Sequence, residues 1–204
     1  MARRTKDEAE KTRNALLNAA EKVFYKHGVA RTSLEQIARA AKVTRGAVYW
    51  HFRDKIEICE AMSNRIFLPQ EDVLEHLASN ASATPLDDLQ KACCDSLKLI
   101  VTDKRRQRVV SILMLRCEYV EDMAAIMDRR RDCKNRMLDR FQRLFTQAHK
   151  RKMLQPHWPP QLAAVSLQAL MSGLINRSLE NPKDFDLAKM GPACLAAFFK
   201  SVQA

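Results

Sequence analysis

Apolar residues recur every three or four positions along most of this chain, the spacing that places them on one face of an α-helix. Residues 7–26 show the pattern clearly, with Leu16, Ala20 and Val23 on one stripe. Runs in which apolar and polar residues alternate, as they do in β-strands, are nearly absent. The pattern therefore predicts an all-α fold.

Capping and stop residues divide this pattern into nine expected helices. Gly28 ends the first helix, because glycine readily adopts the left-handed conformation found there. Ser33 and Gln36 form the capping box that opens the second helix, and Thr44 caps the third. The later helices are expected over residues 54–79, 84–101, 120–152, 160–179 and 186–202, with one more beginning near residue 109.

The long helix over residues 54–79 contains two notable signals. Asp54 and Glu57 form a second capping box at its start. Pro69 lies inside it, where a proline removes one hydrogen bond and clashes with the preceding turn at a cost of about 3 kcal/mol. We therefore expect the helix to break or kink at Pro69.

Positive charge is concentrated at the N-terminal end. Residues 1–55 hold 13 Lys and Arg against 6 Asp and Glu, whereas residues 56–204 hold 22 against 18. A basic segment with two short helices joined by a tight turn is typical of a helix-turn-helix that binds nucleic acid. We expect a DNA-binding domain at residues 1–53 and a larger helical domain at residues 54–204.

Composition narrows the class of protein. Hydrophobic residues make up 47% and charged residues 29%, the balance of a folded globular chain. The longest apolar run has seven residues, far fewer than the roughly 18 of a membrane span, and the N-terminus lacks an apolar signal segment. We therefore expect a cytoplasmic protein.

The six cysteines contain no CxxC pair and have helix-like apolar neighbours. They are typical of small buried hydrophobic residues and not of a disulfide framework or a zinc site, so no metal or cofactor is expected. Adjacent Cys93 and Cys94 are an alternative redox pair, although neighbouring residues point to different faces of a helix.

The segment TRGAVYWHF, residues 44–52, carries the candidate chemistry. At about 100° per residue, Val48 and Phe52 fall on one side of the helix and are expected to pack on the first two helices. Tyr49, Trp50 and His51 cannot all be buried on so short a helix, and the Tyr hydroxyl and Trp N–H need polar partners. An external contact explains these three side chains better than a core position.

DNA is the partner that best accounts for an external contact at this segment. Arg45 carries the planar guanidinium that pairs with guanine in the major groove, and Gly46 lets the helix approach the bases closely. Tyr49 and His51 offer hydrogen bonds to phosphates, and Lys55 offers positive charge. The candidate DNA-contacting residues are Thr32, Ser33, Thr44, Arg45, Gly46, Tyr49, Trp50, His51 and Lys55.

The stretch ARTSLEQIARAAKVTRGAVYWHFRDKIEI resembles the N-terminal domain of TetR/AcrR-family transcriptional repressors, whose hallmark is T-R-G-x-x-Y-W-H-F followed by a lysine. The segments MARRTKDEAEKTR, ILMLRCEYVEDM and FDL resemble the subgroup that represses multidrug efflux genes. Lys42 stands where this family usually has glycine. A left-handed lysine there should cost roughly 1 kcal/mol.

The resemblance implies a nine-helix TetR-like fold and a homodimeric repressor that binds a palindromic operator in double-stranded DNA. It implies that a hydrophobic or cationic small-molecule inducer binds residues 54–204 and releases the DNA, and that the last two helices form the dimer. By position, the candidate ligand-binding residues are Phe67, Cys93, Met114, Arg116, Met137, Phe141 and Met171. Nine methionines suit an adaptable cavity, but for any one of these side chains a place in an ordinary core is the favoured interpretation.

Two other functions, catalysis and membrane binding, fit the sequence less well. Catalysis is disfavoured because the five histidines are scattered and no metal-binding or phosphate-binding motif occurs. Binding to a membrane surface is disfavoured because the basic runs after the first domain are short and lie near helix ends. One alternative stays open, namely a TetR-like regulator that responds to a protein partner or to cysteine oxidation and binds no small-molecule inducer.

Overall fold

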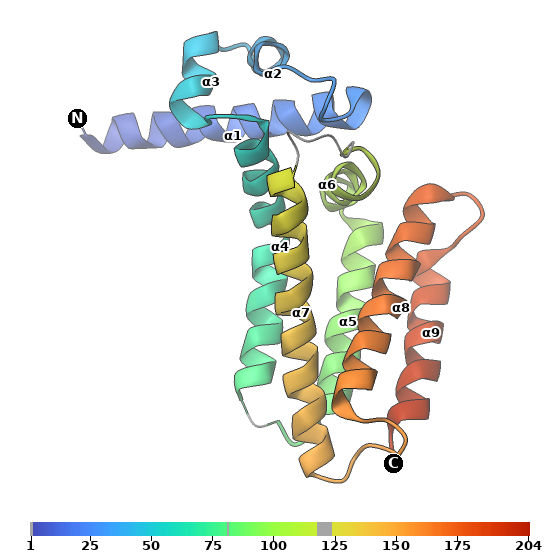
Figure 1. The fold of residues 1–204 in the computed structure, drawn as a ribbon. Helices are drawn as coiled ribbons and strands as arrows, with labels where there is room; N and C mark the ends of the chain where they lie inside the picture. Colours follow the sequence, from blue (N-terminus) through green and yellow to red (C-terminus); the bar gives the residue numbers. More distant parts are fainter. Residues whose placement is uncertain (1, 81, 118–123) are drawn as a thin grey trace. The chain divides into compact units, whose positions relative to one another are not determined.

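A computed structural model describes residues 2–80, 82–117 and 124–204, apart from the side chains of residues 2–5, 67–70, 124–127, 129 and 130. Across these ranges the chain forms nine α-helices and no β-strand, which confirms the predicted all-α, nine-helix fold. The helices are α1 Ala2–His27, α2 Leu34–Ala41, α3 Arg45–His51, α4 Lys55–Ser79, α5 Pro85–Thr102, α6 Lys104–Leu115, α7 Ala124–Lys150, α8 Pro160–Glu180 and α9 Leu187–Val202 (Figure 1).

The chain divides into two compact units. The head unit comprises Met1–Ile66 and Arg108–Arg129, and the body unit comprises Phe67–Gln107 and Arg130–Ala204. Helices α4, α6 and α7 each contribute residues to both units. The expected domain boundary between residues 53 and 54 stays a prediction.

In the head unit, α2 and α3 pack against α1 (Figure 1). Their apolar stripes meet in one core because each helix turns its buried face inward. Gly28 ends α1 as predicted, with a φ of 82° and its N–H donating to the Phe24 carbonyl at 2.9 Å. The largest buried side chains here are Leu16, Leu17, Phe24, Ile37, Phe52, Ile58 and Met62.

In the body unit, α5 packs against α8 and α9. The contact between α5 and α9 is close, because a Cβ placed on Gly191 would lie 2.7 Å from Leu97 Cδ1. Opposite charges join α4 to α7, where Glu75 Oε2 lies 2.9 Å from Arg140 Nε and 2.7 Å from Arg143 Nη2. The body unit is therefore held by small-residue packing on one pair of helices and by ion pairs on another.

The starts of two helices differ from the sequence-based expectation. Helix α1 begins at Ala2 and not near residue 7. Its first turns are polar and carry no apolar stripe, so the apolar spacing alone does not reveal them. Helix α6 begins at Lys104 and not near residue 109, because the Asp103 carboxylate accepts the N–H groups of Arg105 and Arg106 at 2.9 and 3.1 Å. For α7, the expected start at residue 120 lies outside the described residues.

The long helix α4 also differs from the expectation. It is helical without interruption from Lys55 to Ser79, so the helix does not break at residue 69. The other predicted outcome, a kink at this proline, stays a prediction. One lost hydrogen bond is small beside the cooperative propagation of the turns on either side. At its start, Asp54 accepts the N–H of Glu57 at 2.8 Å as predicted, but the Glu57 carboxylate accepts the N–H of Arg53, not that of Asp54.

Candidate nucleic-acid interface

Local interactions define the start of α2, the turn between α2 and α3, and the start of α3. Ser33 Oγ accepts the N–H of Gln36 at 3.2 Å and the Gln36 side chain accepts the N–H of Ser33 at 2.8 Å, which confirms the predicted capping box. Lys42 ends α2 with a φ of 58° and a ψ of 39°, so it does adopt the left-handed conformation. Thr44 then accepts the N–H of Ala47 at 3.2 Å and caps α3.

Helix α3 has one buried side and one exposed side. Val48 in the helix and Phe52, the residue directly after the helix, are buried, which confirms the prediction that they belong to the core. The Arg13 guanidinium covers the Phe52 ring at 5.3 Å from its centroid. Tyr49 is 49% exposed and Trp50 is 72% exposed. The aromatic residues of this segment are therefore divided between core and surface.

Arg45 is held on the exposed side of α3 by two neighbours. Its guanidinium lies 2.5 Å from Glu35 Oε1 on α2, and it donates a hydrogen bond to the Tyr49 hydroxyl at 3.4 Å. These partners raise the pKa of Arg45, the Tyr49 hydrogen bond contributing most. The side chain is 64% exposed, so these contacts orient it without removing it from solvent.

Gly46 also lies on the exposed side of α3. A Cβ placed on this residue would have Thr44 Oγ1, 3.9 Å away, as its nearest neighbour, which is an ordinary contact distance. Glycine in a helix costs about 1 kcal/mol relative to alanine. The described structure therefore offers no packing reason for this glycine.

Three of the sequence-predicted residues are engaged inside the head unit. Thr32 is buried, and its hydroxyl donates to the Gly28 carbonyl at 2.7 Å. Lys55 Nζ donates to the carbonyl oxygens of Val29 and Ala30 at 3.0 Å each. His51 is half-buried, and burial, with the nearby charge of Arg13, lowers its pKa. Thr32 and Lys55 thus stabilise the turn between α1 and α2.

Two partners of this surface escaped the sequence analysis. Arg13 on α1 lies over Phe52 and contributes positive charge near His51. Glu35 on α2 pairs with Arg45. Glu35 is ten positions before Arg45, a spacing that suggests no contact until the turn at Lys42 brings the two helices together.

The candidate ligand-binding residues are distributed over both units. Met114 and Arg116 belong to the head unit, where the Arg116 guanidinium lies 4.6 Å from the centroid of the Tyr25 ring. Cys93 and Phe141 are buried in the body unit, and Met137 and Met171 are partly buried there. Burial raises the pKa of the Cys93 thiol. The side chain of Phe67 lies outside the described part of the structure.

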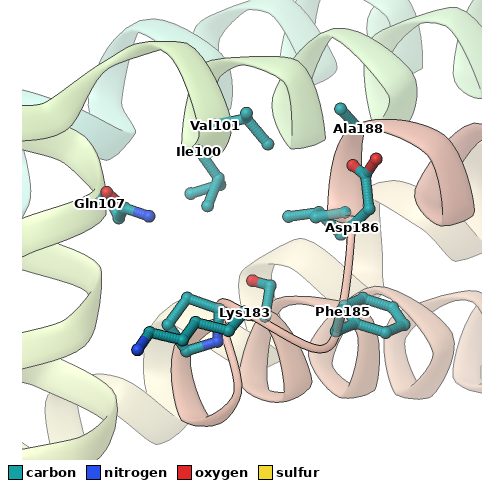
Figure 2. Close-up of a pocket in the computed structure, with 10 residues that line it drawn as sticks. Ile100, Val101, Gln107, Lys183, Phe185, Asp186 and Ala188 are labelled. Carbon is teal, nitrogen blue, oxygen red and sulfur yellow. The ribbon is translucent and has the colours of Figure 1, made fainter.

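A pocket of about 220 Å³ lies in the body unit at the ends of α5, α8 and α9. Figure 2 shows Ile100 and Val101 across from Lys183 and Phe185 of the connection between α8 and α9. Gln107, Ser178, Pro182, Asp186, Leu187 and Ala188 complete its lining. None of the predicted ligand-binding residues contributes to it.

The described residues contain no group of three His, Cys, Asp or Glu side chains that could hold a metal ion. In the same residues, no helix has both the length and the apolar character needed to cross a membrane. The exposed side of α3 is thus the surface on which the candidate chemistry gathers.

Comparison with known proteins agrees with this geometry. Residues 16–62 match the bacterial regulatory proteins of the tetR family, and residues 84–204 match the C-terminal region of MAATS-type transcriptional repressors. The HTH-type transcriptional repressor BepR of Brucella suis is 39% identical over 202 residues, which cover 99% of this chain and 97% of BepR.

Two solved structures are similar over nearly the whole chain. NalD, the secondary repressor of the MexAB-OprM multidrug efflux pump in Pseudomonas aeruginosa, has a TM-score of 0.87 and 38% identity, covering 97% of this chain and 98% of NalD. SmeT, the repressor of the Stenotrophomonas maltophilia multidrug efflux pump SmeDEF, in complex with triclosan, has a TM-score of 0.88 and 31% identity, covering 95% of this chain and 92% of SmeT. The chain belongs to the TetR family of bacterial transcriptional repressors.

Proposed function

We propose that this protein represses a multidrug efflux gene by binding a palindromic operator as a homodimer, and that a hydrophobic or cationic small molecule releases it. The observation that carries the proposal is the exposed side of α3, where oriented Arg45 lies beside Gly46, whose missing side chain has no packing explanation. The relatives NalD and SmeT are repressors of multidrug efflux pumps, which supports the same class of target.

In the proposed complex, the N-terminal turn of α3 enters the major groove. Arg45 reads a guanine through its planar guanidinium, and Gly46 permits the close approach. Thr44, Tyr49, Trp50 and Ser33 lie at the exposed surface and contact the backbone phosphates and sugars. Lys55 and Thr32 instead position the turn that precedes α2.

The proposed dimer forms through α8 and α9. Leu162, Val165 and Ala169 are exposed at helical spacing along α8, and Met190, Ala193 and Ala197 are exposed at the same spacing along α9. Each set therefore lies on one face of its helix. Exposed apolar stripes of this kind are typical of a surface that a second molecule covers.

The proposed inducer site lies in the body unit and includes Cys93, Met137, Phe141 and Met171. Methionine and aromatic side chains adapt to apolar ligands of different shapes. The structure of the relative SmeT in complex with triclosan supports a small-molecule ligand for this class of repressor.

The link from inducer to DNA is proposed to run through α4 and α6. In the head unit, α4 is joined to α1 by a 3.3 Å hydrogen bond from Arg65 to Asn18, and to the turn after α1 by the bonds of Lys55 to Val29 and Ala30. Arg116, just after α6, accepts the N–H of Val29 at 3.1 Å. A shift of either helix would move α1 and change the spacing of the two recognition helices. Half-sites about 34–36 Å apart tolerate little change in that spacing.

The test is a binding assay on the DNA upstream of the protein's own coding sequence, compared with a shuffled fragment of equal length. We expect wild-type protein to prefer the upstream DNA and Arg45→Ala to lose that preference, because a bidentate guanine contact contributes about 1–3 kcal/mol of discrimination. Lys98→Ala, which removes an exposed charge from α5, serves as the control and should keep the preference.

Adding a panel of apolar and cationic compounds to the same assay tests the inducer. Release of the upstream DNA by such a compound supports the proposal, and release should weaken when Phe141 is replaced by alanine. Equal affinity of the wild type for both DNA fragments would refute the operator-binding role. Retained DNA binding with every compound would favour the alternative regulator that has no small-molecule inducer.

A further inference from the structure

An acidic side chain lies beside Arg45 on the surface proposed to contact DNA. Glu35 is in the first turn of α2, and its carboxylate oxygen Oε1 lies 2.5 Å from Arg45 Nη1 at the start of α3. Both side chains are largely exposed, at 53% for Glu35 and 64% for Arg45. A carboxylate is unexpected here, because it repels the phosphates that a DNA-binding surface attracts.

The stability of the fold gives only a weak explanation for this ion pair. Ion pairs between two exposed side chains contribute little to stability. A negative charge in the first turn of α2 interacts favourably with the helix dipole, but that interaction requires no partner on α3. The main effect of the pair is therefore on where the Arg45 guanidinium lies.

Glu35 and Tyr49 hold this guanidinium from two sides. Glu35 binds it from α2, and the Tyr49 hydroxyl, one turn further along α3, accepts a hydrogen bond from Arg45 Nη2 at 3.4 Å. Arg45 Cζ also lies 5.5 Å from the centroid of the Tyr49 ring. A guanidinium carries more N–H donors than these contacts and a guanine together require. Arg45 can thus bind guanine while it stays paired with Glu35.

We propose that Glu35 is a positioning residue that sets the specificity of DNA recognition. It holds Arg45 where the guanidinium meets a guanine, and its charge keeps Arg45 from binding backbone phosphates on other sequences. The inference rests on the proposed operator binding and adds to it a residue of α2 that acts through Arg45.

Specific and nonspecific complexes respond differently to this carboxylate. On DNA of any sequence, Arg45 gains a phosphate contact only if it leaves Glu35, and the abandoned carboxylate then faces the negatively charged backbone. In the specific complex, Arg45 binds guanine and keeps its partner. Glu35 therefore lowers nonspecific affinity more than specific affinity, which raises the ratio between the two.

The test compares Glu35→Gln with the wild type on the upstream DNA and on the shuffled fragment over a series of salt concentrations. Glutamine keeps the size of the side chain and removes its charge. We expect tighter binding to the shuffled fragment and a loss of about tenfold in the preference for upstream DNA. On the shuffled fragment, the slope of log affinity against log salt concentration should steepen by about 0.9, the value for one additional phosphate contact.

Three further variants separate this local effect from other consequences of the substitution. Glu8→Gln removes an exposed carboxylate from α1, changes the net charge by the same amount, and should keep the wild-type preference. Glu35→Asp keeps the charge and should keep the wild-type salt dependence. In the Arg45→Ala background, Glu35→Gln should change neither the preference nor the salt dependence, because Glu35 acts through Arg45.

The outcomes divide as follows between the two proposals. An unchanged preference and an unchanged salt slope in Glu35→Gln overturn the role of Glu35. An equal loss of preference in Glu8→Gln overturns it as well, since net charge alone would then account for the effect. If the wild type binds both fragments equally, the proposed operator binding fails. The salt slope on the shuffled fragment still decides whether Glu35 restrains Arg45, because a slope that steepens only when Arg45 is present supports the restraint.

Discussion

The ammonium group of Lys55, the first residue of α4, donates a hydrogen bond to the carbonyl oxygen of Val29 at 3.0 Å. Val29 lies in the turn that follows α1, and the same ammonium group also bonds Ala30 at 3.0 Å. These carbonyls lie beyond the end of α1, so a single side chain binds the start of one helix to the turn after another. Lys55 therefore stabilises the head unit whether or not it also contacts a phosphate.

Replacing Lys55 by methionine should lower the free energy of unfolding by about 1–3 kcal/mol, since hydrogen bonds from a charged donor contribute in that range. The apolar stem of methionine keeps most of the packing. Urea denaturation measures the change. Arg53→Ala is the matched control: its side chain is 87% exposed, and we expect a change within about 0.5 kcal/mol. Equal effects of the two substitutions would contradict the structural role of Lys55.

Gly46→Ala should separate folding from DNA binding. Alanine fits the helix because the nearest atom to its Cβ would be 3.9 Å away, and helix propensity favours it by about 1 kcal/mol. We expect thermal stability to stay the same or rise while affinity for the upstream DNA falls about tenfold, the equivalent of about 1.4 kcal/mol. A stable variant that keeps full affinity would show that the helix does not approach the bases at this residue.

Lys42→Gly should stabilise the protein. Lys42 adopts a left-handed conformation with a φ of 58°, which costs a residue with a side chain about 1–2 kcal/mol, whereas glycine adopts it freely. Greater freedom of glycine in the unfolded chain offsets part of this, so we expect a net gain below about 1 kcal/mol. Thermal unfolding measures it. A loss of stability would mean that the lysine side chain makes a contact worth more than the backbone strain.

Val165→Glu should weaken the proposed dimer. The side chain is 46% exposed on the apolar stripe of α8, and a charge there would be buried without a partner when the dimer forms. Sedimentation velocity should show a shift from dimer to monomer. Val73→Glu provides the comparison, because Val73 is similarly exposed, at 53%, but lies on α4. If both variants sediment like the wild type, the dimer does not use this face.

Glu75→Gln should lower the free energy of unfolding at neutral pH, and it should lower it much less at acidic pH. The hydrogen bonds from Arg143 and then Arg140 lower the pKa of Glu75 from 4.5 to about 2. A lowered pKa means that the stabilisation is complete above pH 4.5 and is lost as the pH falls through about 2. The difference in stability between wild type and variant should therefore shrink over this interval in a series of urea titrations. The contribution is modest because the Glu75 side chain is 45% exposed.

Glu8→Gln, an exposed carboxylate on α1, is the control for this pH series. Its difference from wild type should stay small at every pH. A difference for Glu75→Gln that does not depend on pH would indicate a packing effect of the substitution and not the loss of the ion pairs with α7.

The start of α2 and the buried side of α3 could be predicted from the sequence, because both depend on residues only a few positions apart. The capping box of Ser33 and Gln36 depends on residues three positions apart, and the burial of Val48 and Phe52 follows from the helical period. Local rules were insufficient at Pro69, where the turns on both sides continue the helix, and at Asp103, whose carboxylate caps α6 earlier than expected.

Sequence alone determined that this protein is helical, that its N-terminal quarter is basic, and that α3 has a core side and an exposed side, because each depends on composition or on spacing within one helix. Only the tertiary structure decided that Lys55 bonds the turn after α1 and that Glu35 orients Arg45. Those contacts join residues on different elements, and their partners depend on how the helices pack, which no local period encodes.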